Sequence, residues 1–467
     1  MAGPATVAAV GLWPAQAAQA SPAATVHVPC SAAALASDIA SAASGETLTL
    51  AAGCAYNLTA ALPVVGQNLT IAGNQATLKR STATATPAFT ILSVDAGTLT
   101  VSNLNFSNGN GALSETQNGS LTVHGGTFTG NSAAAGGAIY AYGGMGNLSV
   151  TGALFTKNQA TGNGGAIYSN LAAGSTTVTN DTFVNNTAGT IGGGLYNFFD
   201  TDVSDSIFSG NQATDGGAIF NNALGGDILT KVTMQGNTAS QNGGGIATYN
   251  TDLSIANSHI TGNHAGDEGG GVYQEGALGY PGLELTSTTV QQNTAGNGAG
   301  IYSVAEDAQL TNSPVGDNHA TADGGGIYND GGGVAFGSVA LGSSAVSNNS
   351  ARANGGGIYN EGTGNVTATS SKIVHNAAAA GGGIYDDSGS TTTLTSSPVQ
   401  YNTPDNCEPP GSITGCTNSA QSPQQQRATA PGSATPSPST GGQEPLPLPA
   451  GSHRHTGALP GEGHLAP

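Results

Sequence analysis

The chain has 467 residues, of which 7% are charged, and its formal net charge is −19. Eight Lys and Arg residues are too few to neutralise a phosphate backbone, so the composition excludes nucleic acid as a partner and disfavours an anionic lipid surface. Gly contributes 74 residues, about twice the usual share, which argues against an ordinary globular core. No stretch reaches the roughly 20 apolar residues of a membrane-spanning helix.

Residues 1–20 are rich in Ala, Val and Gly and end in Ala18-Gln19-Ala20, an A-x-A cleavage signature. The segment predicts a signal peptide, and therefore a secreted, extracellular or cell-envelope protein. Its basic n-region is missing, because the first positive side chain is Lys79. We interpret it as a truncated signal peptide, with a disordered apolar tail as the alternative.

Residues 21–120 do not follow a regular pattern, and we predict that they form an N-terminal cap and the first irregular turns of the fold. The stretch from Ser31 to Ser44 carries Leu35 and Ile39 at helical spacing, begins with a good N-cap residue and stops before a glycine. We therefore expect a short capping helix here.

Residues 121–402 contain a motif that recurs eleven times at intervals of about 27 residues. The copies read apolar-x-x-Asn, followed by Gly-Gly-(Ala/Gly)-apolar-aromatic, in which the apolar residue lies eight or nine residues after the asparagine. A fixed period of this length indicates one structural unit stacked on itself. The repeated asparagines are Asn131, Asn158, Asn186, Asn211, Asn237, Asn263, Asn293, Asn318, Asn349, Asn376 and Asn402.

Three apolar columns appear when the copies are aligned on this asparagine. Position −3 is apolar in every copy, position −8 in ten of eleven, and an Ile, Val or Leu follows the glycines. The residues are β-branched or turn-forming and show no helical period. We therefore predict an all-β fold: a right-handed parallel β-helix, or solenoid, of about 13 turns. It has three strands per turn, each paired with its equivalent one turn along.

The asparagine in every turn has a structural explanation. A side-chain amide offers both a donor and an acceptor, so stacked asparagines bond to one another and to the turn backbone. We predict that the eleven asparagines form a structural ladder rather than a row of catalytic residues. The glycines are explained by close approach at a sharp corner. They do not indicate a nucleotide-binding loop, because no Gly-Lys-Ser/Thr follows them.

Residues 403–418 follow the last repeat, and we predict a C-terminal cap closed by a disulfide. Four cysteines allow three connectivities. We favour the local pairs, because the two pairs lie about 350 residues apart, and disulfides are expected in an exported protein. The cysteines are Cys30, Cys54, Cys407 and Cys416.

Residues 419–467 form the tail of the chain. They are rich in Pro, Ser, Gln and Gly and have almost no apolar content. Such a segment cannot bury enough apolar surface to fold, so we predict that it is disordered.

The repeats resemble those of polymorphic outer-membrane proteins. Residues 128–131 read Phe-Thr-Gly-Asn and residues 136–139 read Gly-Gly-Ala-Ile, which is the F-x-x-N and G-G-A-I pairing of that family. The chain is also similar to secreted right-handed β-helix repeat proteins of actinobacteria, which carry a Cys-flanked N-terminal cap and a closing Cys loop. The first resemblance implies an adhesin-like role, and both imply a secreted or cell-surface β-helix.

An aromatic residue follows the apolar strand residue in most repeats. If the Ile points inward, its neighbour points outward by strand alternation, so the tyrosines should line one surface. There they either stabilise adjacent rungs by stacking or form a platform for sugar rings. The candidate glycan-binding residues, with a cell-surface or extracellular polysaccharide as the expected partner, are Tyr273, Tyr302, Tyr328, Tyr359 and Tyr385.

Carboxylates follow three of these tyrosines by two residues. Asp330, Glu361 and Asp387 come on successive turns at a rise of about 5 Å, where they repel one another unless an ion or protonation relieves the charge. Calcium takes six to eight oxygen ligands, so these residues are candidate calcium ligands. A solvated turn is the alternative, and no other cofactor is expected.

Parallel β-helices also host polysaccharide lyases and hydrolases. A lyase needs a basic residue as proton acceptor, and Arg352 and Lys372 are the weak catalytic candidates because they flank the acidic column. A pectinase-like hydrolase needs carboxylates on neighbouring turns, whereas residues 250–252 and 386–387 lie about five turns, or roughly 24 Å, apart. We therefore expect a structural or adhesive surface protein, with a polysaccharide-processing enzyme as the alternative.

Overall fold

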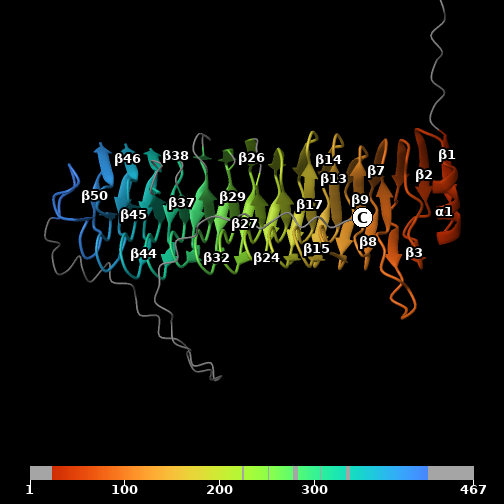
Figure 1. Cartoon of the computed structure of the whole chain (residues 1–467), viewed down its shortest axis with the longest axis horizontal. Coiled ribbons are helices and arrows are strands. Elements are labelled where there is room, and N and C mark those ends of the chain that lie inside the picture. Colours follow the sequence, from red (N-terminus) through yellow and green to blue (C-terminus); the bar gives the residue numbers. More distant parts are fainter. Residues whose placement is uncertain are drawn as a thin grey trace, which may run out of the picture. The chain divides into compact units, whose positions relative to one another are not determined.

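A computed structural model describes residues 24–222, 226–250, 252–276, 282–304, 307–332 and 337–418. The predicted signal peptide, residues 1–20, and the predicted disordered tail, residues 419–467, lie outside these residues. The described part is a parallel β-helix (Figure 1). Within it, no helix is long and apolar enough to cross a membrane.

Strands pair in parallel with their equivalents one turn along, and they stack into four sheets rather than the three expected. We name them sheets A, B, C and D, with 15, 14, 13 and nine strands. One turn runs through sheets A, B, D and C in that order, as β10 to β13 do before β14 begins the next turn. The β-helix has about 14 turns, one more than predicted.

Sheets A and B begin each turn, with strands of four or five residues in sheet A and mostly three in sheet B. Sheet A contains β1 (Thr25–Val28), β2 (Glu46–Leu50), β4 (Leu69–Ala72), β7 (Thr98–Ser102), β10 (Ser120–His124), β14 (Leu148–Thr151), β18 (Thr176–Thr179), β22 (Thr201–Ser204), β26 (Gly226–Thr230), β30 (Asp252–Ala256), β34 (Leu283–Thr286), β38 (Asp307–Thr311), β42 (Ser338–Gly342), β46 (Asn365–Thr369) and β49 (Thr391–Thr395). Sheet B contains β3 (Ala55–Leu58), β5 (Thr77–Arg80), β8 (Asn105–Ser107), β11 (Thr127–Thr129), β15 (Leu154–Thr156), β19 (Thr182–Val184), β23 (Ile207–Ser209), β27 (Thr233–Gln235), β31 (His259–Thr261), β35 (Thr289–Gln291), β39 (Val315–Gly316), β43 (Ala345–Ser347), β47 (Lys372–Val374) and β50 (Val399–Gln400).

Sheets C and D complete each turn. Sheet C contains β6 (Leu92–Val94), β9 (Leu113–Gln117), β13 (Ile139–Gly143), β17 (Ile167–Leu171), β21 (Leu195–Asn197), β25 (Ile219–Asn221), β29 (Ile246–Tyr249), β33 (Val272–Glu275), β37 (Ile301–Val304), β41 (Ile327–Asp330), β45 (Ile358–Glu361), β48 (Ile384–Asp386) and β51 (Cys407–Glu408). Sheet D contains β12 (Ser132–Ala133), β16 (Gln159–Ala160), β20 (Thr187–Ala188), β24 (Gln212–Ala213), β28 (Thr238–Ala239), β32 (His264–Ala265), β36 (Thr294–Ala295), β40 (His319–Ala320) and β44 (Ser350–Ala351).

The sequence does not reveal sheet D, because two-residue strands are too short to show an alternating pattern. Their second residue is alanine throughout, and several of these alanines form an apolar cluster separate from the main core. That cluster consists of Ala265, Ala295, Ala299, Ala320 and Ala351.

One continuous apolar cluster runs along the inside of the tube. The three columns found in the sequence face inward in every regular turn, as Val123, Phe128 and Ile139 do, each 0% exposed. Strand alternation explains this, because the residues between them point outward, as the burial pattern of β10 shows. The predicted parallel β-helix is therefore confirmed.

The N-terminal end of the tube carries the predicted helix, α1 (Ala32–Ser41), which ends three residues before the expected Ser44. Leu35 and Ile39 are buried on its inner side. The side chain of Ser31 accepts a hydrogen bond from the first turn and caps the helix. The disulfide Cys30–Cys54 joins the residue before this cap to the edge of the first turns.

The C-terminal end is closed by continued strand pairing. The disulfide Cys407–Cys416 is formed, so both local pairs predicted from the sequence are confirmed. Within this closed loop, β51 adds to sheet C beside β48. The cap therefore extends the β-helix by one more rung instead of covering it with a separate element.

Candidate functional site

The repeated asparagines lie at the corner between sheets B and D and are buried, at 0–1% exposure. Each Oδ1 accepts two hydrogen bonds from the asparagine one turn before. For Asn237 Oδ1, the donors are the backbone N–H and the Nδ2 of Asn211, at 2.9 and 3.0 Å. The same Nδ2 also donates to the carbonyl of Phe183, at 3.0 Å. The amides therefore satisfy one another and the backbone, which leaves them no role in chemistry.

This ladder extends beyond the eleven repeats. At the first turn, the N–H of Gly109 donates to Asn131 Oδ1 at 2.9 Å. At the last turn, the N–H of Asn402 donates to Asn406 Oδ1 at 3.2 Å, and the N–H of Asn406 donates to Asn418 Oδ1 at 2.9 Å. The sequence does not reveal the last two members, because they break the 27-residue spacing.

The tyrosines of sheet C stack face to face, and the prediction of an open platform is wrong for the central ones. Tyr273, Tyr302 and Tyr328 are 5, 6 and 8% exposed. Ring centroids lie 4.6–5.7 Å apart from Tyr273 to Tyr385. Each ring face contacts the next ring, because the strand spacing matches the thickness of an aromatic stack. Towards the C-terminal end, Tyr359 and Tyr385 are half-buried.

The aromatic stack is continuous even where the repeat breaks. Ala247 occupies the aromatic position of β29, and the ring of Tyr249, two residues on, fills the gap. Its centroid lies 5.3 Å from that of Phe220 and 5.5 Å from that of Tyr273. The stack therefore stabilises neighbouring rungs over the whole sheet.

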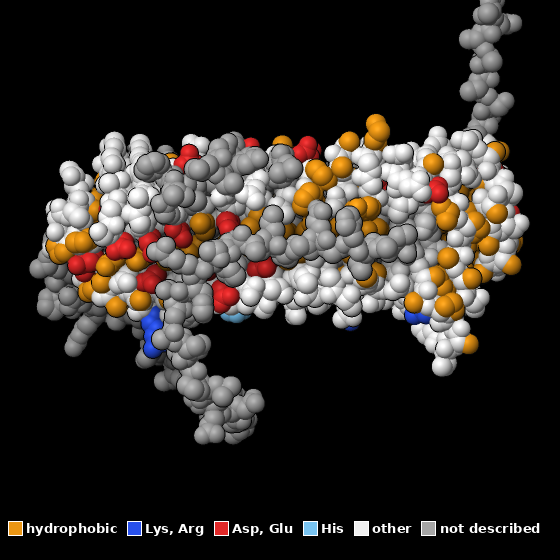
Figure 2. Space-filling view, in the orientation of Figure 1, with side chains coloured by type: hydrophobic (Ala, Val, Ile, Leu, Met, Phe, Trp, Pro, Cys, Tyr) orange, Lys and Arg blue, Asp and Glu red, His pale blue; other side chains and the backbone are white. Residues whose placement is uncertain are grey.

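Carboxylates occupy the outer edge of this stack. The hydroxyl of Tyr273 donates to Glu275 at 2.8 Å, and that of Tyr302 donates to Asp330 at 3.5 Å. Acidic side chains gather on the face that carries β29, β37 and β45 (Figure 2). The tyrosine hydroxyls thus act as donors to a row of acids.

Burial controls the titration of these acids. Burial raises the pKa of Glu268 to about 7, against the lowering effect of its hydrogen bond with Tyr302. Burial likewise raises the pKa of Glu361, which accepts a hydrogen bond from Tyr328, and the neighbouring Asp330 adds to the rise. Glu268 therefore changes charge close to neutral pH.

The predicted calcium ligands do not form a preformed site. Asp330 and Glu361 accept hydrogen bonds from tyrosines, and Asp387 lies on the next turn. Among the described residues, no group of three or more Asp, Glu, His or Cys side chains is placed to hold a metal ion.

The weak catalytic candidates lie apart from one another in the fold. Arg352 follows β44 of sheet D, and Lys372 begins β47 of sheet B, whereas the acidic row belongs to sheet C. Both side chains are exposed. Within the described residues, the ion pair that forms is Lys231 with Asp205, at 3.5 Å. The structure does not bring these bases together with the acids.

A column of polar residues points into the tube, two positions after the apolar residue that begins each strand of sheet C. Residues such as Asn329 and Asp330 look like one surface column in sequence, but alternation sends the first inward and the second outward. Asn329 Nδ2 donates to Asn360 Oδ1 at 2.8 Å, and Asn360 Nδ2 donates to Asp386 at 3.0 Å. The buried polar members are Glu115, Ser169, Asn197, Asn221, Thr248, Gln274, Ser303, Asn329, Asn360 and Asp386.

Glu115 is the first member of this column and is 1% exposed. Its Oε2 has no hydrogen-bond partner among the described residues. Burial raises the pKa of Glu115 to about 8, because a charged carboxylate loses its hydration inside the tube. The side chain is therefore mostly neutral at pH 7.

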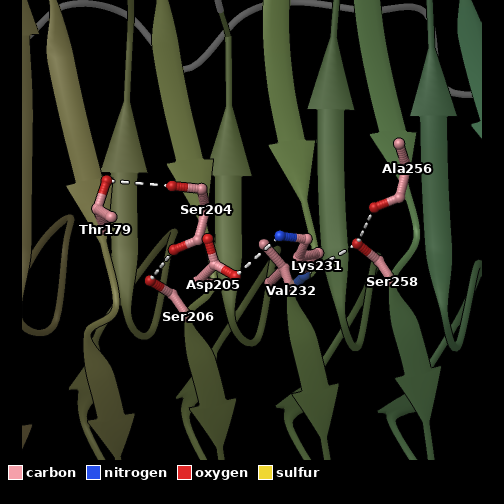
Figure 3. A network of polar contacts seen from close by, with 8 residues as sticks. All are labelled: Thr179, Ser204, Asp205, Ser206, Lys231, Val232, Ala256 and Ser258. Atoms are coloured by element: carbon pink, nitrogen blue, oxygen red, sulfur yellow. Dashed lines mark hydrogen bonds and ion pairs between the residues drawn. The ribbon is translucent and has the colours of Figure 1, made fainter.

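A second ladder, formed by hydroxyls, lies at the corner between sheets A and B, five residues before seven of the eleven ladder asparagines (Figure 3). Ser258 Oγ accepts from the N–H of Val232 at 2.9 Å and donates to the carbonyl of Ala256 at 2.8 Å. On the outside of the same corner, Lys231 pairs with Asp205. The alignment contains this signal, since position −5 is Ser or Thr in most repeats.

A hollow of about 450 Å³ lies along the same corner in earlier turns. It is lined by side chains and backbone from five successive turns, and none of the lining residues is charged. The lining residues are Gln75, Asn103, Asn105, Gly126, Thr127, Gly152, Ala153, Leu154, Asn180 and Thr182.

Comparison with known proteins bears on this geometry. The family described as the Chlamydia polymorphic membrane protein (Chlamydia_PMP) repeat matches residues 125–142, 152–170, 205–222 and 343–361. Each matched segment spans the corner from sheet B through the asparagine to the glycines or the sheet C strand. The chain is therefore a β-helix protein whose repeats are similar to those of polymorphic membrane proteins. No curated protein matches it.

Among solved structures, the crystal structure of bacteriophage CBA120 tailspike protein 3 is similar at 13% sequence identity and a TM-score of 0.38. The alignment covers 81% of this chain and 59% of the tailspike chain. This chain thus spans about three fifths of the length of that protein.

Proposed function

We propose that this chain is a structural and adhesive β-helix protein of the cell surface. The observation that carries the proposal is the set of four segments that match polymorphic membrane protein repeats, all within one continuous tube. Proteins of that description are membrane proteins of the cell surface. The acidic composition and the disulfides at both ends agree with an extracellular setting.

The ladders support a structural role. Buried amide hydrogen bonds join successive turns from Asn131 to Asn418, and stacked rings join them from Tyr140 to Tyr385, so this part of the tube resists bending and local opening. An extended, rigid body suits a protein that presents a binding surface away from the cell. The enzyme alternative has no comparable support, because the candidate bases and the acids lie in different sheets.

Intact producing cells provide the direct test. An antibody raised against the folded β-helix should label intact cells or the medium, and added protease should remove that signal without breaking the cells. Purified full-length chain should then be retained by surfaces coated with extracellular polysaccharide, and heat-unfolded chain serves as the control. A chain detected solely after cell breakage would contradict the proposal.

A further inference from the structure

The hollow at the corner between sheets A and B follows the axis of the tube. Its floor comes from the turns between β4 and β5, β7 and β8, β10 and β11, β14 and β15, and β18 and β19. Its inner wall is formed by the first residues of the sheet B strands, which are in register, as Leu154 is with Thr127 and Thr182. Equivalent atoms therefore repeat about every 4.8 Å along the groove.

Two glycines keep the groove open. Gly126 has φ +94°, and a Cβ there would lie 2.1 Å from the carbonyl oxygen of Leu104. Gly152 has φ +72° and leaves the corner without a side chain. On the turns that follow, the same corner carries Asp205 and Lys231, whose ion pair stands on the outside of the tube (Figure 3). The groove is thus lined by uncharged residues, and the carboxylate of Asp181 is buried beneath it, where it accepts a hydrogen bond from the N–H of Ala153.

Free amides project into this groove. The side chains of Gln75, Asn103 and Asn180 are exposed, and none of them forms a hydrogen bond within the described residues. Asn105 differs, because both ends of its amide are hydrogen-bonded. Its Oδ1 accepts from the N–H of Thr127 at 2.9 Å, and its Nδ2 donates to the backbone carbonyl of Gln75. The three free amides offer six N–H donors and three carbonyl acceptors.

The chemistry of the lining restricts the ligand. It contains no cation that would pair with a uronate or sulfate group, and the net charge of −19 repels anions. It contains no carboxylate that would hold a cation. Leu154, at 37% exposure, adds an apolar surface between the amides. A neutral ligand that carries hydroxyl groups on a weakly apolar skeleton matches this lining.

We propose that this groove binds a neutral, linear oligosaccharide lying along the axis of the β-helix. The proposal rests on the adhesive function proposed above and assigns it to this corner rather than to the tyrosine stack. Sugar hydroxyls pair with the free amides, and a pyranose C–H face packs on Leu154. A repeating polymer suits a groove whose own groups repeat from turn to turn.

The test compares the full-length chain with two groove variants on an array of neutral, uronate and sulfated glycans. Asn103 and Asn180 have φ of +48° and +57°, so the double change Asn103→Gly with Asn180→Gly removes both amides and keeps the backbone conformation. Leu154→Lys is an independent variant at an exposed strand position. The matched control is Asn257→Gly, at the same corner with φ +53° but outside the groove.

We expect binding to at least one neutral glycan that weakens tenfold or more in the double variant and in Leu154→Lys. Binding should be unchanged in Asn257→Gly. Neutral-glycan binding that survives both groove variants would overturn the assignment, as would binding confined to anionic glycans or to peptides. If cells still display the chain while no neutral glycan binds, the groove proposal fails and the surface role stands.

Discussion

The two halves of the β-helix share one backbone and differ in how they fill it. In the N-terminal half, the column three residues before the ladder asparagine is a stack of phenylalanines whose centroids lie 4.4–5.0 Å apart, from Phe106 to Phe208. In the C-terminal half, the same column is aliphatic, as at Val290 and Val346. The asparagine ladder is identical in both. The hydrogen bonds of the ladder are therefore the same in both halves, whereas the core beside them is filled by aromatic rings in one half and by aliphatic side chains in the other.

The outer surfaces of the two halves also differ, in the charge of the side chains that they carry. The N-terminal half carries an uncharged, amide-lined groove at the corner between sheets A and B. The C-terminal half carries carboxylates that accept hydrogen bonds from stacked tyrosines. A repeat protein can therefore place different chemistry on successive turns while its interior pairing stays constant.

The two halves should differ most in the stability lost when a core residue is truncated. Phe183 is fully buried between two rings, so Phe183→Ala should cost about 3–5 kcal/mol of unfolding free energy. Val290→Ala removes less volume and should cost about 2 kcal/mol. Urea denaturation followed by circular dichroism measures both. Equal losses would show that the aromatic stack adds nothing beyond apolar burial.

The ladder should show no such contrast. Asn186→Ala and Asn293→Ala each leave a carbonyl and a neighbouring asparagine without partners, and each should cost about 3 kcal/mol. The control Gln291→Ala, on the adjacent strand, should change stability by less than about 0.5 kcal/mol. Markedly different losses at the two asparagines would break the claim that the ladder is uniform.

Lowering the pH from 8 to 5 should raise the stability of both halves of the β-helix. The folded-state pKa values of Glu115 and Glu268 are raised to about 8 and about 7. The folded state therefore holds more protons than the unfolded state between the ordinary carboxyl pKa and these values, and stability falls as pH rises through that window. The melting temperature should be a few degrees higher at pH 5 than at pH 8.

Glu115→Gln and Glu268→Gln should each reduce this difference, because an amide has no proton to lose. Both variants should melt higher than the native chain at pH 8. Melting curves that are independent of pH in the native chain would contradict the raised pKa values.

The smallest effect should be at the tyrosine hydroxyls. Tyr328→Phe keeps the stacked ring and removes the hydrogen bond to Glu361, so it should cost about 1 kcal/mol or less. Tyr328→Leu also removes the stacking and should cost more. If the two variants lost the same stability, the hydroxyl–carboxylate row rather than the rings would hold these rungs together.

Much of the fold could be predicted from the sequence, because one period governs it. The spacing of Asn131 and its ten equivalents gives the turn, and the apolar positions around it give the inward columns. Sheet D could not be predicted, because its two-residue strands are too short to show alternating apolar and polar residues. The place of Asn406 and Asn418 in the ladder could not be predicted either, because they depart from the 27-residue period.

The surface was harder to predict than the core. Tyr302 points outward by alternation, yet neighbouring rings bury it, because exposure depends on what lies one turn away and not on the strand itself. Asn329 and Asp330 are adjacent in sequence and lie on opposite sides of sheet C. The groove needs Gly126 and Asn180 from turns that are distant in sequence, so no local motif marks it.

The continuation of the ladder into the cap changes which groups the C-terminal end of the β-helix presents. A parallel β-helix that ended at Asn402 would present the unpaired edges of its sheets, and a second copy could add to them as a further turn. Here β51 pairs with the edge of sheet C, and Asn406 and Asn418 take up the last hydrogen bonds of the ladder. The disulfide Cys407–Cys416 holds that closure in place. The C-terminal cap therefore removes the edge of sheet C and the end of the asparagine ladder as pairing sites for a second copy of the chain.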